Sequence, residues 1–116
     1  MHELQVTHRI LDIVLKHAKA NAVNKIISIQ LRIGELSDLE DEWIQKYFDH
    51  LSKDTVAENA KIEIERTPVV LQCDDCSHSF EVDIKEINEI QCPECAGRKC
   101  TLVSGREYYI KDMRVV

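Results

Sequence analysis

The chain of 116 residues lacks three features, each of which would point to a whole class of function. It has no run of about 18 apolar residues, the length that a membrane-spanning helix needs. Its first residues, Met1-His2-Glu3, lack the basic and apolar regions of a secretory signal. Lys and Arg number 15 against 21 acidic residues and are scattered, whereas phosphate binding needs them clustered. We therefore expect a cytoplasmic protein that binds neither membranes nor nucleic acid.

Cysteine, by contrast, is plentiful, with five in the chain. In a reducing cytoplasm such residues serve metal or redox chemistry more often than disulfide frameworks. Four of them form two Cys-x2-Cys pairs on either side of residues 77–91, namely Cys73, Cys76, Cys92 and Cys95. A two-residue gap lets both sulfurs of a pair reach one ion, and two pairs complete the tetrahedron that zinc prefers. Because four thiolates leave no open coordination position, we predict a structural zinc site rather than a catalytic one.

Iron is the competing metal for this site, because Cys92-Pro93-Glu94-Cys95 has the Cys-Pro-x-Cys form found in rubredoxins. Rubredoxins usually place Gly directly after each cysteine pair, where this chain has Ser77 and Ala96. Zinc is therefore the preferred assignment. The fifth cysteine, Cys100, is expected to be a small apolar residue at the start of a strand. His78 is expected to be an exposed neighbour of the site.

Hydrophobic periodicity predicts two helices and several strands. Residues 4–22 carry apolar side chains on one wide face, as in an amphipathic helix. Residues 27–33 alternate between apolar and polar side chains, as in a half-buried strand. The spacing of Ser37 and Glu40 is that of a capping box and predicts a second helix that ends near Lys53. Its buried side is expected to consist of Leu39, Trp43, Tyr47, Phe48 and Leu51.

The later strands are expected at residues 61–65 and 107–116, with short strands at 69–71 and 80–82 around the cysteines. The strand–helix–strand order implies parallel neighbours joined by a crossover, and the last strand is expected to pair with the same sheet. The predicted fold class is α+β, with two helices packed on a small mixed three-stranded sheet and an inserted zinc-ribbon module. The expected domains are 1–67 plus 106–116, and 68–105.

The N-terminus offers a second set of metal ligands. If Met1 is retained, its free amine, the amide of His2 and the His2 imidazole can close fused chelate rings in one plane. Square-planar nitrogen donors suit Ni(II) and Cu(II) better than zinc. Glu3 can add a carboxylate or its own amide. A histidine at position 2 is also compatible with an ordinary frayed terminus, so the residues alone leave both interpretations open.

Taken together, these residues show that the chain resembles the HypA/HybF family of hydrogenase-maturation proteins, which are nickel metallochaperones. The similarity covers essentially the whole length. It begins with Met1-His2-Glu3 and continues through Ile33-Gly34-Glu35-Leu36-Ser37 and the two cysteine pairs. It ends in Gly105-Arg106-Glu107. Relatives often have Pro in the turn before the second helix, where this chain has Asp38-Leu39-Glu40-Asp41.

The resemblance implies a zinc ribbon inserted into an α/β nickel-binding domain, with nickel bound at the N-terminus through His2. Some relatives bring an acidic residue close to the nickel, and Glu40 is the nearest match in this chain. The resemblance also implies delivery of nickel to the [NiFe]-hydrogenase large-subunit precursor, together with a GTPase of the same pathway. Some relatives also serve urease, so urease maturation proteins remain open as partners, and so does a homodimer.

Two interpretations from other classes stay open beside the metallochaperone. The first is a zinc-ribbon adaptor that mediates protein–protein interaction, which would not depend on the N-terminus. The second is a rubredoxin-like electron carrier, which would be red as purified. No nucleophile paired with a base and no open metal site is legible in the sequence, so we do not expect an enzyme.

Overall fold

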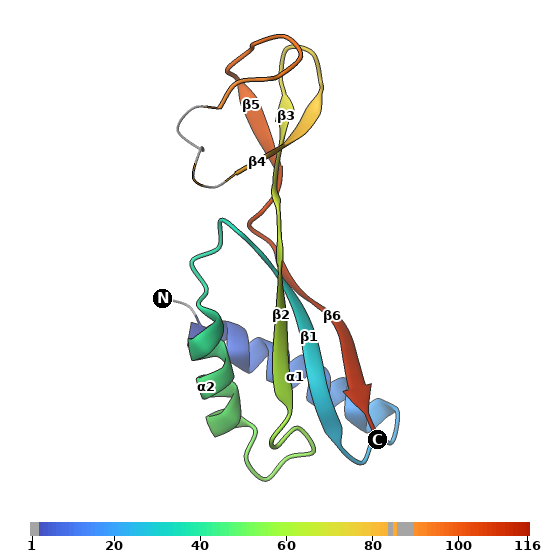
Figure 1. The fold of residues 1–116 in the computed structure, drawn as a ribbon. Helices are drawn as coiled ribbons and strands as arrows, with labels where there is room; N and C mark the ends of the chain where they lie inside the picture. Colours follow the sequence, from blue (N-terminus) through green and yellow to red (C-terminus); the bar gives the residue numbers. More distant parts are fainter. Residues whose placement is uncertain (1–2, 84, 86–89) are drawn as a thin grey trace. The chain divides into compact units, whose positions relative to one another are not determined.

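The computed structural model describes residues 3–83, 85 and 90–116 (Figure 1). In chain order its elements are α1 (Glu3–Ala20), β1 (Ile26–Gly34), α2 (Asp41–Leu51), β2 (Lys61–Thr67), β3 (Val69–Cys73), β4 (Ser79–Val82), β5 (Cys100–Ser104) and β6 (Tyr108–Val115). The strands form two sheets, in the orders β2-β1-β6 and β4-β3-β5. The expected fold class is confirmed, because two helices accompany a small mixed sheet and a four-cysteine module. In the second sheet, the sequence predicts the ranges of β3 and β4, but for β5 only a strand start at Cys100.

The chain divides into two compact units. The helix–sheet unit comprises Met1–Arg32, Asp38–Glu65 and Tyr109–Val116, and the cysteine unit comprises Ile33–Ser37 and Arg66–Tyr108. The turn after β1 thus groups with the cysteines rather than with the helices. The assignment of a nickel-binding role to one part of the chain and a zinc-binding role to the other stays a prediction.

Helix α1 buries one apolar stripe at helical spacing, made of Val6, Ile10, Leu11, Val14 and Ala18. Its end is a Schellman motif, in which Ala22 takes a left-handed φ of 53°. The N–H of Val23 then donates to the carbonyl of Ala18 at 3.0 Å. No helix in the described part of the chain is both long and apolar enough to cross a membrane.

Helix α2 differs from expectation in its start and in its buried face. Its N-cap is Glu40, which makes no side-chain capping bond, so the predicted capping box from Ser37 is wrong. Ile44 and Phe48 are fully buried, whereas Trp43 is 40% exposed. Trp43 instead packs against Tyr47 on the outer face, with ring centroids 5.7 Å apart. The buried stripe of α2 is therefore centred on Ile44 and Phe48, and the aromatic pair lies at the surface.

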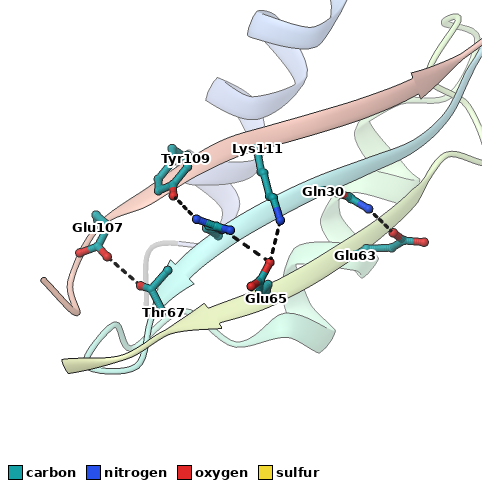
Figure 2. Close-up of polar contacts among 8 residues, drawn as sticks. Gln30, Glu63, Glu65, Thr67, Glu107, Tyr109 and Lys111 are labelled. Atoms are coloured by element: carbon teal, nitrogen blue, oxygen red, sulfur yellow. Dashed lines mark hydrogen bonds and ion pairs between the residues drawn. The ribbon is translucent and has the colours of Figure 1, made fainter. Parts of the chain in front are cut away.

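The sheet of the helix–sheet unit is mixed, as predicted. In Figure 2, β1 and β2 run in the same direction and β6 runs in the opposite one. Ile29 and Leu31 are buried on one face of β1, whereas Gln30 and Arg32 carry polar groups. The predicted alternation fails at the start of the strand, where Ile26 is buried and Ile27 is exposed.

Polar side chains on the open face of this sheet connect all three strands (Figure 2). Glu65 on β2 forms ion pairs with Arg32 on β1 at 3.5 Å and with Lys111 on β6 at 3.3 Å. Arg32 also donates a hydrogen bond to the hydroxyl of Tyr109 at 3.1 Å. The hydrogen bond from Lys111 and the charge of Arg32 lower the pKa of the Glu65 carboxyl. Because these contacts are largely exposed to solvent, each contributes little to the stability of the fold.

The cysteine unit is built on β3, which pairs antiparallel with β4 on one side and β5 on the other. Val69 and Leu71 are buried and alternate along β3 with less buried side chains. The backbone at Gly34, the last residue of β1, lies very close to the backbone at Gly105, which follows β5. A Cβ on Gly34 would lie 2.0 Å from the carbonyl carbon of Gly105, so no side chain fits there.

Candidate metal centre

Four cysteine sulfurs converge at one end of the cysteine unit. One Sγ atom from each of Cys73, Cys76, Cys92 and Cys95 lies within 4.8 Å of every other. The Sγ atoms of Cys73 and Cys95 are 3.4 Å apart, and those of Cys76 and Cys92 are 3.6 Å apart. Cys73 and Cys92 are buried, whereas Cys76 and Cys95 are exposed. The structure therefore brings together all four residues singled out by their spacing.

The first cysteine pair lies on a tight turn that follows β3. The N–H of Ser77 donates to the carbonyl of Cys73 at 2.9 Å, and the N–H of Cys73 donates to the carbonyl of His78 at 2.9 Å. Ser77 has a left-handed φ of 64°, which turns the chain back after Cys76. This backbone geometry points both sulfurs of the pair to one side.

The second pair repeats this geometry. The N–H of Ala96 donates to the carbonyl of Cys92 at 2.9 Å, and the N–H of Cys92 donates to the carbonyl of Gly97 at 2.9 Å. Ala96 has a left-handed φ of 61°. A Cβ on Gly97 would lie 3.2 Å from the sulfur of Cys95 and 3.3 Å from that of Cys73. The absence of a side chain at position 97 therefore leaves room for the sulfurs to converge.

The pKa values of two thiols in the cluster are shifted in opposite directions. Burial opposes ionisation of Cys92, but the backbone N–H groups of Cys95 and Glu94 and the neighbouring thiols lower its pKa to about 7. The N–H of Gly97 acts to lower the pKa of Cys95, but hydrogen bonds with Cys73 and Cys76 outweigh it and raise that pKa to about 12. The thiol of Cys92 thus ionises readily, whereas a second negative charge beside it is unfavourable. A cation is therefore needed to hold four thiolates together.

The donor set suits a tetrahedral ion bound by soft ligands. Four sulfurs at about 2.3 Å from a zinc ion lie roughly 3.8 Å from one another. The closest sulfur pairs here, at 3.4 and 3.6 Å, and the outer limit of 4.8 Å bracket that value. The four cysteines can therefore hold one ion with small adjustments of the side chains, and they leave it no free coordination position.

Comparison with known proteins decides the family. A family model described as "Hydrogenase/urease nickel incorporation, metallochaperone, hypA" matches residues 1–115. The chain belongs to the HypA family. A hydrogenase maturation factor HypA of Actinobacillus succinogenes is 37% identical over 115 residues, which cover 99% of each chain. One of Dehalococcoides mccartyi is 32% identical over 99% of this chain and 94% of the relative.

Solved HypA structures have the same fold. The solution structure of the Ni metallochaperone HypA from Helicobacter pylori is 26% identical, with a TM-score of 0.72. The match covers all of this chain and 98% of that one. A further solution structure, of a HypA protein, has a TM-score of 0.78 at 26% identity and is covered over 97% of its length. The chain is thus a member of a family of metallochaperones for nickel incorporation.

The predicted nickel ligands of this HypA-family chain are only partly described. Met1 and His2 lie outside the described residues. Glu3 opens α1 and is buried, and its carbonyl accepts a hydrogen bond from the hydroxyl of Thr7 at 2.5 Å. Glu40 is exposed at the N-cap of α2, where its carbonyl accepts the N–H of Ile44 at 3.1 Å. The nickel role of all four predicted residues stays a prediction.

Two features beside the cysteine cluster were missed by reasoning from the sequence. Cys100 does begin strand β5, as expected, but it also lies directly opposite Cys73 in the β3–β5 register. His78 is half-buried rather than exposed, and its ring stacks on Phe80 with centroids 6.2 Å apart. Cysteine spacing carries no information about either feature. The position of Cys100 arises from strand pairing, so a hairpin register extended from the first cysteine pair would have found it. The contact of His78 with Phe80 follows from their two-residue spacing, which places both side chains on one face of an extended segment.

Proposed function

We propose that this chain is a nickel metallochaperone that binds Ni(II) at its N-terminus and delivers it during [NiFe]-hydrogenase maturation. The observation that carries the proposal is the family match, which runs from residue 1 through both cysteine pairs and on to residue 115. It favours this function over the adaptor and electron-carrier interpretations, neither of which needs the N-terminal segment.

The proposed ligands are the Met1 amine, the His2 amide and the His2 imidazole, with Glu3 as a further donor and Glu40 as a nearby carboxylate. A nitrogen-rich planar set suits Ni(II). A carrier must hold its ion firmly enough to transport it and loosely enough to release it, and ligands at a chain terminus meet both needs. The burial of Glu3 makes its backbone amide a better candidate than its carboxylate.

The four cysteines, by this proposal, hold a structural zinc ion. When bound, zinc supplies a tetrahedral cross-link that neutralises the thiolates and fixes the two turns relative to each other. Residues 1–67 plus 106–116 would then form the nickel-binding domain and residues 68–105 the zinc domain. The proposed partners are the maturation GTPase and the hydrogenase large-subunit precursor in the cytoplasm, with urease maturation proteins and a second copy of the chain as further candidates.

A nickel titration of untagged protein tests the central claim. His2→Ala removes one of three chelating nitrogens, and one residue added before Met1 moves the amine out of register. Both changes should abolish most of the nickel affinity measured by calorimetry at neutral pH. His50→Ala is the matched control, because His50 is an exposed histidine in the last turn of α2. Equal affinity in all four proteins would contradict N-terminal binding.

Elemental analysis tests the metal assigned to the cysteines. Protein purified without added metal should contain one zinc per chain and remain colourless. An equimolar iron content with visible absorption would replace zinc by iron and favour the electron carrier.

A further inference from the structure

The fifth cysteine faces one of the four cluster cysteines across a strand pair. In the antiparallel β3–β5 ladder, Cys73 is directly opposite Cys100, and the preceding pairs are Gln72 with Thr101 and Leu71 with Leu102. Residues directly opposite each other in a ladder point to the same face of the sheet. Both thiols therefore lie on one face of the same two strands.

The hydrogen-bond pattern identifies the kind of pair that they form. The N–H of Asp74 donates to the carbonyl of Lys99 at 2.9 Å, so the adjoining position is a hydrogen-bonded pair. Because the two kinds of pair alternate, Cys73 and Cys100 form a non-hydrogen-bonded pair, in which Cα atoms are about 4.5 Å apart. This separation falls at the short end of the range that a disulfide spans, about 4.4–6.8 Å.

Neighbouring contacts hold the two strands in this register. The hydroxyl of Thr101 donates to the carboxylate of Asp74 at 2.6 Å and ties the start of β5 to the first cysteine turn. Cys73 is buried, whereas Cys100 is half-buried. The pair thus combines one less buried thiol outside the metal cluster with one thiol of the cluster.

We propose that peroxide converts Cys73 and Cys100 into a disulfide and thereby releases the ion held by the four cysteines. Peroxide oxidises the thiol of Cys100 to a sulfenic acid, and water leaves. The sulfur of Cys73 then attacks the sulfur of Cys100, the S–O bond breaks, and the oxygen leaves as hydroxide. Two thiols lose two electrons in total, and one peroxide gains them.

The consequence for the metal centre follows from the ligand count. A disulfide sulfur is no longer a thiolate, so the site keeps three ligands and gains an open position. Cys76 and Cys95 are exposed, which lets a competing chelator reach the remaining ligands. Reduction by a dithiol restores both thiols, so the device is reversible. This inference rests on the metal site of the proposed function.

The test compares three full-length, zinc-loaded proteins exposed to dilute hydrogen peroxide beside a chromogenic zinc chelator. They are the wild type, Cys100→Ser, and Cys100→Ser combined with Val103→Cys. The combined variant keeps five cysteines but moves one to position 103, which is exposed and does not pair with Cys73 in the β3–β5 register. Circular dichroism and zinc content before oxidation show that each variant is folded and loaded.

The wild type should release zinc several-fold faster than both variants, and peptide mapping should show a disulfide between Cys73 and Cys100. A dithiol added with zinc should restore the original zinc content. Equal release rates in the three proteins, or a first disulfide between other cysteines, would overturn the proposal. If the wild type holds no zinc before oxidation, the proposed zinc site fails, and mapping of the metal-free protein still tests the pairing on its own.

Discussion

The two units of the chain are stabilised in different ways. The helix–sheet unit buries a continuous set of apolar side chains from both helices and its sheet, including Val14, Ile29, Leu31, Ile44 and Phe48. In the cysteine unit, by contrast, two of the buried side chains are the thiols of Cys73 and Cys92. A hydrophobic core stabilises the first unit at any metal concentration, whereas the buried thiols of the second are proposed metal ligands. If the proposed site is correct, metal binding and folding are linked in the cysteine unit and independent in the helix–sheet unit.

The largest effect that this comparison predicts follows replacement of a cluster cysteine. Cys92→Ala removes a buried ligand and leaves three sulfurs without a complete site. The cysteine unit should lose its zinc and its fixed structure, whereas the helical circular dichroism signal should remain. Amide exchange should rise in β3, β4 and β5 and stay low in α1. A uniform loss of helical signal would show that the units depend on one another.

The converse change should spare the metal. Phe48→Ala opens a cavity at a fully buried position of α2 and should lower the free energy of unfolding of the helix–sheet unit by about 3–5 kcal/mol. Zinc content should not change. Trp43→Ala, at a 40% exposed position of the same helix, is the matched control and should cost far less. Denaturant unfolding followed by circular dichroism, with zinc measured in parallel, checks both expectations.

Zinc affinity should depend steeply on pH, because protons leave the thiols when the ion binds. The N–H of His78 acts to lower the pKa of Cys76, but burial and hydrogen bonds with the thiols of Cys92 and Cys73 raise it above its ordinary value. That of Cys95 is raised to about 12. Both thiols are therefore protonated at pH 8 in the metal-free protein and must each release a proton.

Affinity should accordingly rise by at least about a hundredfold per pH unit between pH 7 and 8, because at least two protons leave. Acid should release zinc, and alkali should not. Competition with a chelator of known affinity at several pH values measures the slope, and a slope near zero would contradict the protonated cluster. Phe48→Ala should give the same slope as the wild type, because the helix–sheet unit holds none of these thiols.

The smallest effect concerns the turns after the cysteines. Ala96 has a left-handed φ of 61°, a conformation that is strained for alanine and unstrained for glycine. Ala96→Gly should therefore stabilise the zinc-loaded cysteine unit by at most about 1 kcal/mol and leave the helix–sheet unit unchanged. Thermal unfolding monitored by zinc release measures the difference. Ala57→Gly, at a buried site in the other unit, is the opposite control and should destabilise.

Local features of this chain were readable from its sequence. The span of α1 follows from one apolar stripe, and the four-cysteine cluster follows from two short spacings. Non-local features were not readable. The rotation of α2 toward Ile44 depends on what the helix packs against, and the position of Cys100 opposite Cys73 depends on how β5 aligns with β3. Periodicity fixes which residues share a face, but it does not fix which face a neighbour will cover.

The close approach of Gly34 and Gly105 limits which substitutions the chain can accept at position 34. Many crowded positions tolerate a larger residue when a neighbour shrinks in compensation. Here the neighbour is already glycine, and the atoms in the way are backbone atoms. Two hydrogen bonds beside the contact, from Gly34 to the carbonyl of Glu107 and from Leu36 to that of Gly105, are both 2.8 Å long and resist separation of the strands. No second-site change in a side chain can therefore rescue a substitution at position 34.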